Sequence, residues 1–87
     1  MIYALLFKSS VQKDLRRIPN SAVARIQEAL RGLQTDPVPQ GSIRLHADGC
    51  FYRIRVGSYR VIYEVDREIK IVTITRIGHR KNVYAGM

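Results

Sequence analysis

Hydrophobic residues follow helical spacing in the first half of the chain and strand-like alternation in the second. The opening run Ile2–Phe7 is apolar on both faces, which predicts a first strand that is buried. Apolar residues then recur at helical spacing over residues 9–18 and again over residues 21–34. Pro19 separates these segments, so the pattern predicts two consecutive helices joined by a short link.

The second half of the chain predicts turns and strands. Residues 35–42 include two prolines and a glycine and are expected to form a loop. Residues 43–45 form a short candidate strand, and a longer candidate covers residues 69–77. A three-residue link before the longer strand would place Arg60 opposite Ile74.

Between these candidates, the segment from Tyr52 to Tyr63 predicts a tight β-hairpin. Gly57-Ser58 separates two alternating runs, and glycine at the first of two loop residues fits a type II′ turn. This turn fixes the register and places Arg55 directly opposite Arg60. Like charges opposed across a sheet are destabilising. Two arginines kept there without a carboxylate between them indicate an external anion, and phosphate matches the guanidinium fork.

The order of elements predicts an α+β fold, with an N-terminal strand, a two-helix hairpin and then three or four antiparallel strands. We expect a single domain over residues 1–87, with the helices packed on one face of the sheet. The opposite face would carry Arg53, Arg55, Arg60 and Arg76. That face would form a concave, basic surface open to solvent.

Composition narrows the class of partner. With 15 Lys and Arg against 7 Asp and Glu, the formal net charge of +8 favours nucleic acid, a ribosomal surface or an acidic protein. An ordinary basic domain is the plain alternative. Cys50 is the only cysteine, which fits a reducing cytoplasm, and we expect it to be a small buried hydrophobic residue. We find no signal peptide, membrane-spanning stretch or cluster of residues at metal-ligand spacing, and we expect no cofactor.

Motifs along nearly the whole chain resemble the RelE/ParE superfamily of toxins from toxin–antitoxin modules. They are Lys13-Asp14-Leu15, Leu33 with Asp36-Pro37, Leu45, the block from Tyr52 to Tyr63, His79-Arg80 and Val83-Tyr84. The central block is the specific part. The resemblance implies a compact α+β toxin of the cytoplasm, neutralised by a cognate antitoxin encoded beside it. The spacing from Arg80 to Tyr84 resembles the RelE branch more than the ParE branch.

Each branch of the superfamily implies a different activity. The RelE branch implies an endoribonuclease (a metal-independent mRNA interferase) that cleaves mRNA in the ribosomal A site. The ParE branch implies a non-enzymatic inhibitor of DNA gyrase. The implied partners are the antitoxin, the ribosome and mRNA, and the toxin–antitoxin complex is expected to bind its own operator DNA through the antitoxin. A small basic RNA-binding module without activity is the third possibility.

Metal-free RNA cleavage needs a proton taken from the 2′-hydroxyl, stabilisation of a charged phosphorane and protonation of the 5′-oxygen. Motif positions shared with the superfamily assign charge stabilisation to Arg60 and Arg80. Tyr84, whose anion a ring of arginines would favour, and His79, because histidine is a natural acid or base, are candidates for proton transfer. Substrate positioning is assigned to a further basic set, Arg53, Arg55, Arg76 and Lys81. In the RelE branch the positions of Arg53 and Arg55 are often lysine.

Each candidate also has a plainer interpretation. Arg60 could be a solvated strand residue, and Arg80 and Lys81 could be ordinary charges near the chain end. Tyr84 could pack the C-terminus onto the sheet. His79 could be a surface or capping residue without a catalytic partner.

Overall fold

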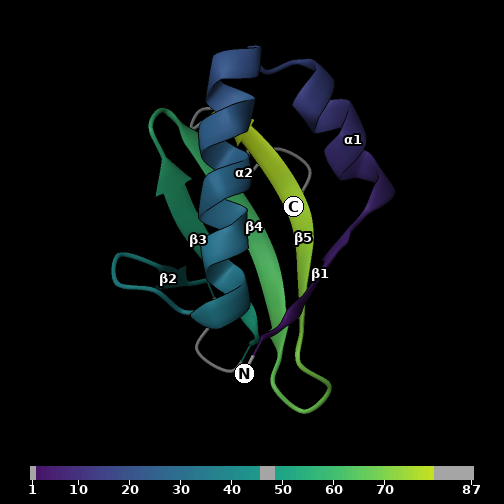
Figure 1. The fold of residues 1–87 in the computed structure, drawn as a ribbon, viewed down its shortest axis with the longest axis vertical. Coiled ribbons are helices and arrows are strands. Elements are labelled where there is room, and N and C mark those ends of the chain that lie inside the picture. The colour runs from purple at the N-terminus through teal and green to yellow at the C-terminus, as the bar shows by residue number, and fades with distance from the viewer. Residues whose placement is uncertain (1, 46–48, 80–87) are drawn as a thin grey trace.

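The computed structural model describes residues 2–45 and 49–79, and its elements follow the predicted order (Figure 1). One short strand is followed by two helices and then by four more strands. Their bounds are β1 Ala4–Phe7, α1 Ser9–Arg16, α2 Asn20–Thr35, β2 Ile43–Arg44, β3 Phe51–Val56, β4 Tyr59–Asp66 and β5 Ile71–His79. The two predicted helices are confirmed, and Pro19 separates them because its ring cannot continue a helix.

All the strands join one mixed sheet in the order β1-β5-β4-β3-β2. Neighbours are antiparallel except β1 and β5, which run parallel with Ala4 opposite Ile71. The α+β class is confirmed, but within the described residues the sheet has five strands, since the first strand also joins it. Strand β1 is followed by a helix and not by a tight turn, so it cannot form a hairpin with the next strand in sequence. Its sequence pattern therefore does not indicate which strand it will pair with.

Strand β1 is less buried than its apolar sequence predicts. Tyr3, just before it, is 7% exposed, whereas Leu6 and Phe7 are 51% and 48% exposed. The strand lies at the edge of the sheet, where only part of its surface meets the core. The prediction that this segment is buried on both faces is therefore wrong.

The predicted hairpin of β3 and β4 is confirmed in register. Val56 lies opposite Tyr59, Arg55 opposite Arg60 and, at the far end, Tyr52 opposite Tyr63. Gly57 adopts a φ of 61°. Only glycine takes this conformation without steric cost, which is why it occupies the first loop position.

The turn between β4 and β5 is longer than predicted. Asp66 Oδ1 accepts hydrogen bonds from the backbone amides of Glu68 and Ile69, at 3.0 and 3.1 Å. Lys70 then takes a left-handed φ of 60°, and β5 begins at Ile71. Asp at the start of a turn favours this local bonding, which competes with a shorter loop.

A β-bulge in β5 compensates for the longer turn. The prediction that Arg60 lies opposite Ile74 is wrong, and the new register alone would have moved Arg76 to the other face. Thr75 is the extra residue of the bulge, and its hydroxyl donates to the Ile62 carbonyl at 2.9 Å. Beyond the bulge Arg76 lies opposite Ile62, so it keeps its predicted face.

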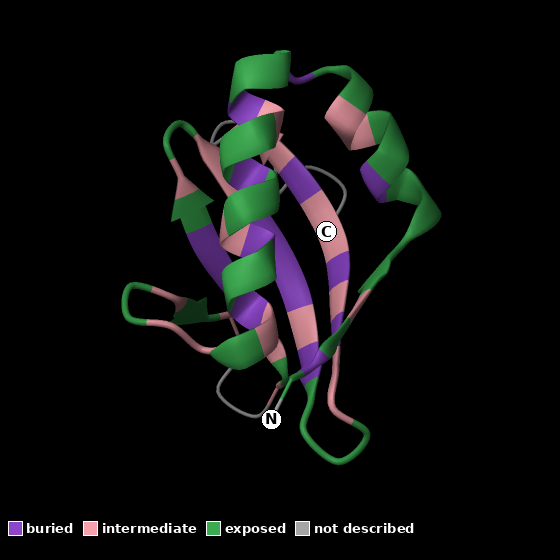
Figure 2. Ribbon diagram, viewed as in Figure 1, coloured by how far each residue is buried: buried purple, intermediate pink, exposed green. Residues whose placement is uncertain are grey.

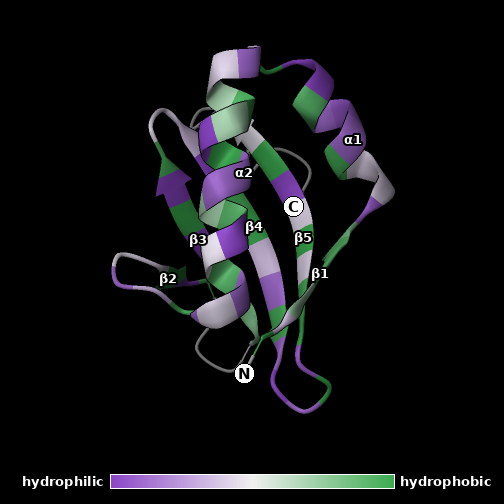
Figure 3. Ribbon diagram, in the orientation of Figure 1, coloured by the Kyte–Doolittle hydropathy of each residue, from purple (hydrophilic) through white to green (hydrophobic). Residues whose placement is uncertain are grey.

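Helix α2 lies across the centre of the sheet and covers one face, while α1 lies beside β5 (Figures 1 and 2). A stripe of buried residues runs along α2, and Ile26 at its centre is fully buried, as are Val61 and Tyr63 of β4. Most of α1 is hydrophilic (Figure 3), and Val11 is its buried contact with the core. Neither helix in the described part of the chain has the length and apolar character needed to span a membrane.

Candidate functional site

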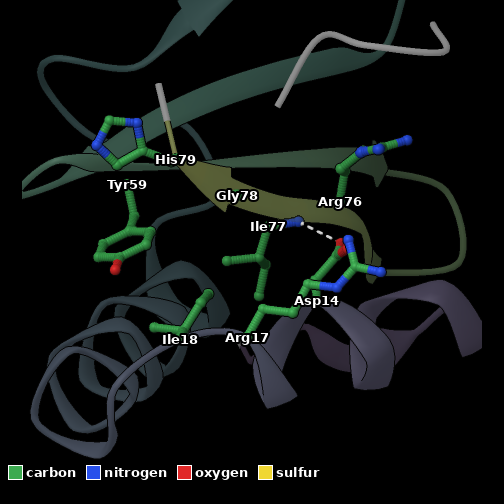
Figure 4. Close-up of a pocket in the computed structure, with 8 residues that line it drawn as sticks. All are labelled: Asp14, Arg17, Ile18, Tyr59, Arg76, Ile77, Gly78 and His79. Atoms are coloured by element: carbon green, nitrogen blue, oxygen red, sulfur yellow. Dashed lines mark hydrogen bonds between the residues drawn. The ribbon is translucent and has the colours of Figure 1, made fainter. Parts of the chain in front are cut away.

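Four arginines lie on the sheet face opposite α2. Side chains alternate between the faces of a strand, and the neighbours of these arginines belong to the core beneath α2. Arg55 is opposite Arg60, and Ile62 is opposite both Arg53 and Arg76. In Figure 4, Arg76 extends away from the side of β5 on which the adjacent isoleucine meets the helices. We call this set, Arg53, Arg55, Arg60 and Arg76, the arginine face.

The sequence predicts that the arginine face is open to solvent, but its four side chains differ in exposure. Arg55 is exposed, and Arg60 and Arg76 are half-buried. Arg53, however, is only 9% exposed, and its cross-strand neighbour Ile62 is fully buried. Arg53 is paired on both sides, with Ile43 of β2 and Ile62 of β4, so the aliphatic part of its side chain has apolar neighbours. The prediction of a solvent-exposed basic surface is wrong there, and the accessible charge is concentrated towards the β3–β4 turn.

A hollow of about 100 Å³ lies at this end of the sheet, lined by Arg55, Gly57, Ser58, Tyr59 and Arg60. Residues directly opposite each other in antiparallel strands have Cβ atoms roughly 4.5–5.5 Å apart. The two arginine side chains therefore border a common volume. Among the residues that the structure describes, those that line it include no Asp or Glu. A bound anion would offset the repulsion between the two guanidinium groups and accept hydrogen bonds from both.

His79 lies on the helix-facing side of the sheet. It is opposite Tyr59 at the end of β5, and the two rings meet edge to face with centroids 5.9 Å apart. Tyr59 in turn packs against the core. The structure therefore does not bring His79 together with Arg55 and Arg60 on the arginine face.

A second cavity, of about 200 Å³, lies between α1 and the adjoining ends of β4 and β5 (Figure 4). It is lined by Asp14, Arg17, Ile18, Tyr59, Arg76, Ile77, Gly78 and His79. Asp14 Oδ2 accepts a hydrogen bond from the backbone amide of Ile77 at 3.0 Å. Asp14 belongs to a sequence motif, but nothing in the spacing of that motif indicates that α1 lies against β5, so no role for Asp14 could be predicted.

The remaining predicted site residues, Arg80, Lys81 and Tyr84, lie outside the described residues. Within residues 2–45 and 49–79, no group of three or more His, Cys, Asp or Glu side chains could hold a metal ion.

Cys50 is exposed, so the prediction that it is a buried hydrophobic residue is wrong. Its thiol donates a hydrogen bond to Glu64 Oε2 at 3.3 Å, because β3 and β4 bring the two side chains together at one end of the hairpin. This bond raises the pKa of the Cys50 thiol, and the negative charge of the carboxylate adds to the effect. The thiolate is the reactive form, so the structure indicates an unreactive cysteine.

Replacement of Glu64 by glutamine is expected to speed alkylation of Cys50 by iodoacetamide at about pH 8, by about threefold or more. The change removes the charge that disfavours the thiolate. Mass spectrometry of the folded protein measures the rate, and Glu68→Gln, in the turn between β4 and β5, is the matched control. Equal rates for the wild type and the Glu64→Gln variant would contradict the assignment.

Comparison with known proteins identifies this arrangement as that of the small toxins of type II toxin–antitoxin systems. Residues 5–84 match the family described as "ParE toxin of type II toxin-antitoxin system, parDE". The chain belongs to the RelE/ParE superfamily, as its motifs predicted.

Individual relatives carry RelE-type names. Toxin RelG of Mycobacterium tuberculosis is 33% identical over 86 residues, which cover 97% of this chain and 98% of that protein. A chain of the archaeal RelE–RelB complex from Pyrococcus horikoshii has a TM-score of 0.83 at 32% identity, over 95% of this chain and 100% of that one. A chain of the RelBE2 toxin–antitoxin complex from M. tuberculosis has a TM-score of 0.79 at 28% identity, over 92% and 100%. The protein is thus a RelE-like toxin of a toxin–antitoxin system.

Proposed function

We propose that this toxin is a ribosome-dependent mRNA endonuclease, which cleaves mRNA in the A site and so inhibits translation in the cytoplasm. The observation that carries the proposal is the pair Arg55 and Arg60, which lie opposite each other and border one hollow at the β3–β4 turn. Two fixed cations around a phosphate-sized space suit the backbone of RNA. The RelE-type names of the relatives support the choice of this branch.

The proposed reaction is an internal transfer within the RNA. The 2′-oxygen attacks the adjacent phosphorus, and its proton passes to a base. The bond from phosphorus to the 5′-oxygen breaks, and that oxygen takes up a proton, so no water is consumed. Negative charge grows on the non-bridging oxygens of the phosphorane, and Arg60 and Arg80 are proposed to stabilise it. Such preorganised charge is usually the largest catalytic contribution.

The other candidates take supporting roles in this proposal. Arg55, Arg76 and Lys81 hold substrate phosphates, whereas Arg53 contributes positive potential from its buried position. Proton transfer is assigned to Tyr84. His79 is the alternative, and its contact with Tyr59 on the helix-facing side of the sheet makes it the weaker candidate.

A cognate antitoxin is the proposed protein partner. Similar toxins have been solved in complex with RelB antitoxins. We expect the antitoxin to inhibit by covering Arg55 and Arg60 or by displacing Tyr84, and the toxin–antitoxin complex to bind its operator DNA through the antitoxin. Hydrogen exchange would detect either mode as protection, or altered exposure, of the hairpin or of the C-terminal residues on complex formation.

Inhibition of DNA gyrase is the second candidate function. It is favoured by the matching family model, which describes a ParE toxin. In that case the basic surface would contact the enzyme or its DNA and would cleave no RNA.

Translation in a cell-free extract separates these functions. The purified toxin is expected to stop protein synthesis and to produce mRNA cuts in phase with codons, which sequencing of the 5′ ends would locate. Normal translation together with trapped gyrase–DNA complexes would support the second candidate. Normal translation with salt-sensitive RNA binding alone would leave a binding module without activity.

A further inference from the structure

The last part of β5 has a neighbouring strand on one side only, among the residues the structure describes. β1 pairs with β5 as far as Phe7 and Ile74, and the amide of Lys8 donates to the Ile74 carbonyl at 3.0 Å. The chain then turns into α1. From Thr75 to His79, β5 is therefore paired with β4 and leaves its other edge to α1.

Side chains of α1 take the place of the missing strand. Asp14 Oδ2 accepts the hydrogen bond of the Ile77 amide at 3.0 Å, and Ser10 Oγ donates to the Thr75 carbonyl at 3.4 Å. Val11 is fully buried between them and holds the helix against the core. Figure 4 shows the carboxylate of Asp14 directed at the Ile77 amide from below the strand. A carboxylate is a strong acceptor for a backbone amide.

The hydrogen bond between Asp14 and the Ile77 amide lies close to an irregularity in the sheet. The bulge at Thr75 interrupts the β4–β5 ladder two residues before Ile77, and a bulge locally loosens pairing. Ile77 is flanked by Arg76, which belongs to the arginine face, and by Gly78, which lies opposite Arg60. Fixing the Ile77 backbone therefore fixes how Arg76 and the end of β5 sit relative to Arg60.

We propose that Asp14 is a positioning residue for the RNA-cleaving site. Its carboxylate binds the backbone of Ile77 and holds the end of β5 in the position that aligns Arg76 with Arg60. The inference rests on the proposed function. Asp14 would then contribute to catalysis although its side chain lies on the opposite side of β5 from the arginine face, where the substrate is proposed to bind.

The test compares Asp14→Ala and Asp14→Asn with the matched control Asp36→Ala. Asp36 Oδ1 also accepts one backbone amide, that of Val38 at 3.3 Å, and it lies in the loop after α2, away from β5. Three quantities are measured for each purified variant: the thermal midpoint, the exchange rate of the Ile77 amide, and single-turnover mRNA cleavage on programmed ribosomes. Cleavage is followed over a range of toxin concentrations, which separates the rate at saturation from the half-saturating concentration.

Asp14→Ala is expected to lower the saturating rate by about 10- to 100-fold, because a small misalignment of reacting groups has effects of this size. The half-saturating concentration should change by less than about threefold, since accessible cations such as Arg55 keep binding RNA. Exchange at Ile77 should accelerate. Asp14→Asn, whose amide oxygen still accepts the bond, should recover the rate to within about threefold of wild type.

Three results would overturn the inference. One is an Asp14→Ala variant that cleaves as well as Asp36→Ala at equal thermal stability. Another is an unchanged exchange rate at Ile77. The third is an Asp14→Asn variant as slow as Asp14→Ala while Ile77 stays protected, which would indicate charge rather than positioning. A wild-type protein that cuts no mRNA would instead remove the proposed function, and this role of Asp14 with it.

Discussion

Replacement of Arg60 by alanine is expected to slow mRNA cleavage by about 10²- to 10³-fold and to relieve growth arrest on expression. Arg60 lies opposite Arg55 and borders the hollow proposed for the scissile phosphate. Removing it takes away fixed positive charge at the place where negative charge develops in the proposed reaction. The fold should survive, because Arg60 is half-buried and does not belong to the hydrophobic core beneath α2. Single-turnover cleavage on programmed ribosomes measures the rate, and circular dichroism verifies the fold.

Arg67→Ala is the matched control for this prediction. Arg67 is an exposed arginine in the β4–β5 turn, at the other end of β4 from Arg60. The Arg67→Ala substitution removes the same formal charge. It should leave the cleavage rate within about twofold of wild type if the position of the charge matters more than net charge. Equal losses in the two variants would point to general electrostatic attraction. A double variant of Arg60 and Arg80 that remains fully toxic would remove the proposed phosphate clamp altogether.

Replacement of Ile26 by alanine is expected to lower the free energy of unfolding by about 2–5 kcal/mol. Ile26 is fully buried on the face of α2 that covers the sheet. Truncation loses the transfer free energy of the removed carbons and leaves a cavity beneath the helix. For a domain of this size the loss is a large share of the total stability. Urea denaturation followed by circular dichroism measures it.

Ile69→Ala makes the same chemical change on the surface, since Ile69 is 63% exposed in the β4–β5 turn. It should change stability by no more than about 0.5 kcal/mol. If both variants lost the same stability, α2 would not be the cover of the core that the structure describes.

The hairpin could be predicted residue by residue because its register is set locally. A two-residue loop with glycine first leaves one way to pair the flanking strands. The positions of Arg55 and Arg60 opposite each other followed directly. The helices could be predicted from equally local information, namely the apolar spacing within each segment and Pro19 between them.

Long-range pairing could not be predicted in the same way. The partner of β1 is separated from it by most of the chain, and no pattern within Ala4–Phe7 selects β5. The predicted length of the β4–β5 turn was wrong for a different reason. Hydrogen bonds from backbone amides to Asp66 stabilise a longer loop than the alternation of apolar residues suggested.

The site shows the same division between local and distant effects. The predicted face of each of the four arginines is correct, but the burial of Arg53 depends on its neighbours in two other strands, Ile43 and Ile62. His79 has suitable chemistry for proton transfer, yet its register puts it beside Tyr59 on the other face. Asp14 was missed because its contact with Ile77 joins residues far apart in sequence.

Thr75 has a consequence for the evolution of such toxins. A one-residue insertion or deletion in a strand usually reverses every later side chain. Here Ile74 already lies opposite Tyr63, and Arg76 already lies opposite Ile62. Loss of Thr75 would therefore yield a regular ladder with the same residues on the arginine face. A single-residue gap at this point in an alignment of relatives would keep the pairing of β4 with β5, although the hydrogen bond from the Thr75 hydroxyl to the Ile62 carbonyl would be lost. The same gap within β4 would instead move the later side chains of that strand to the opposite face.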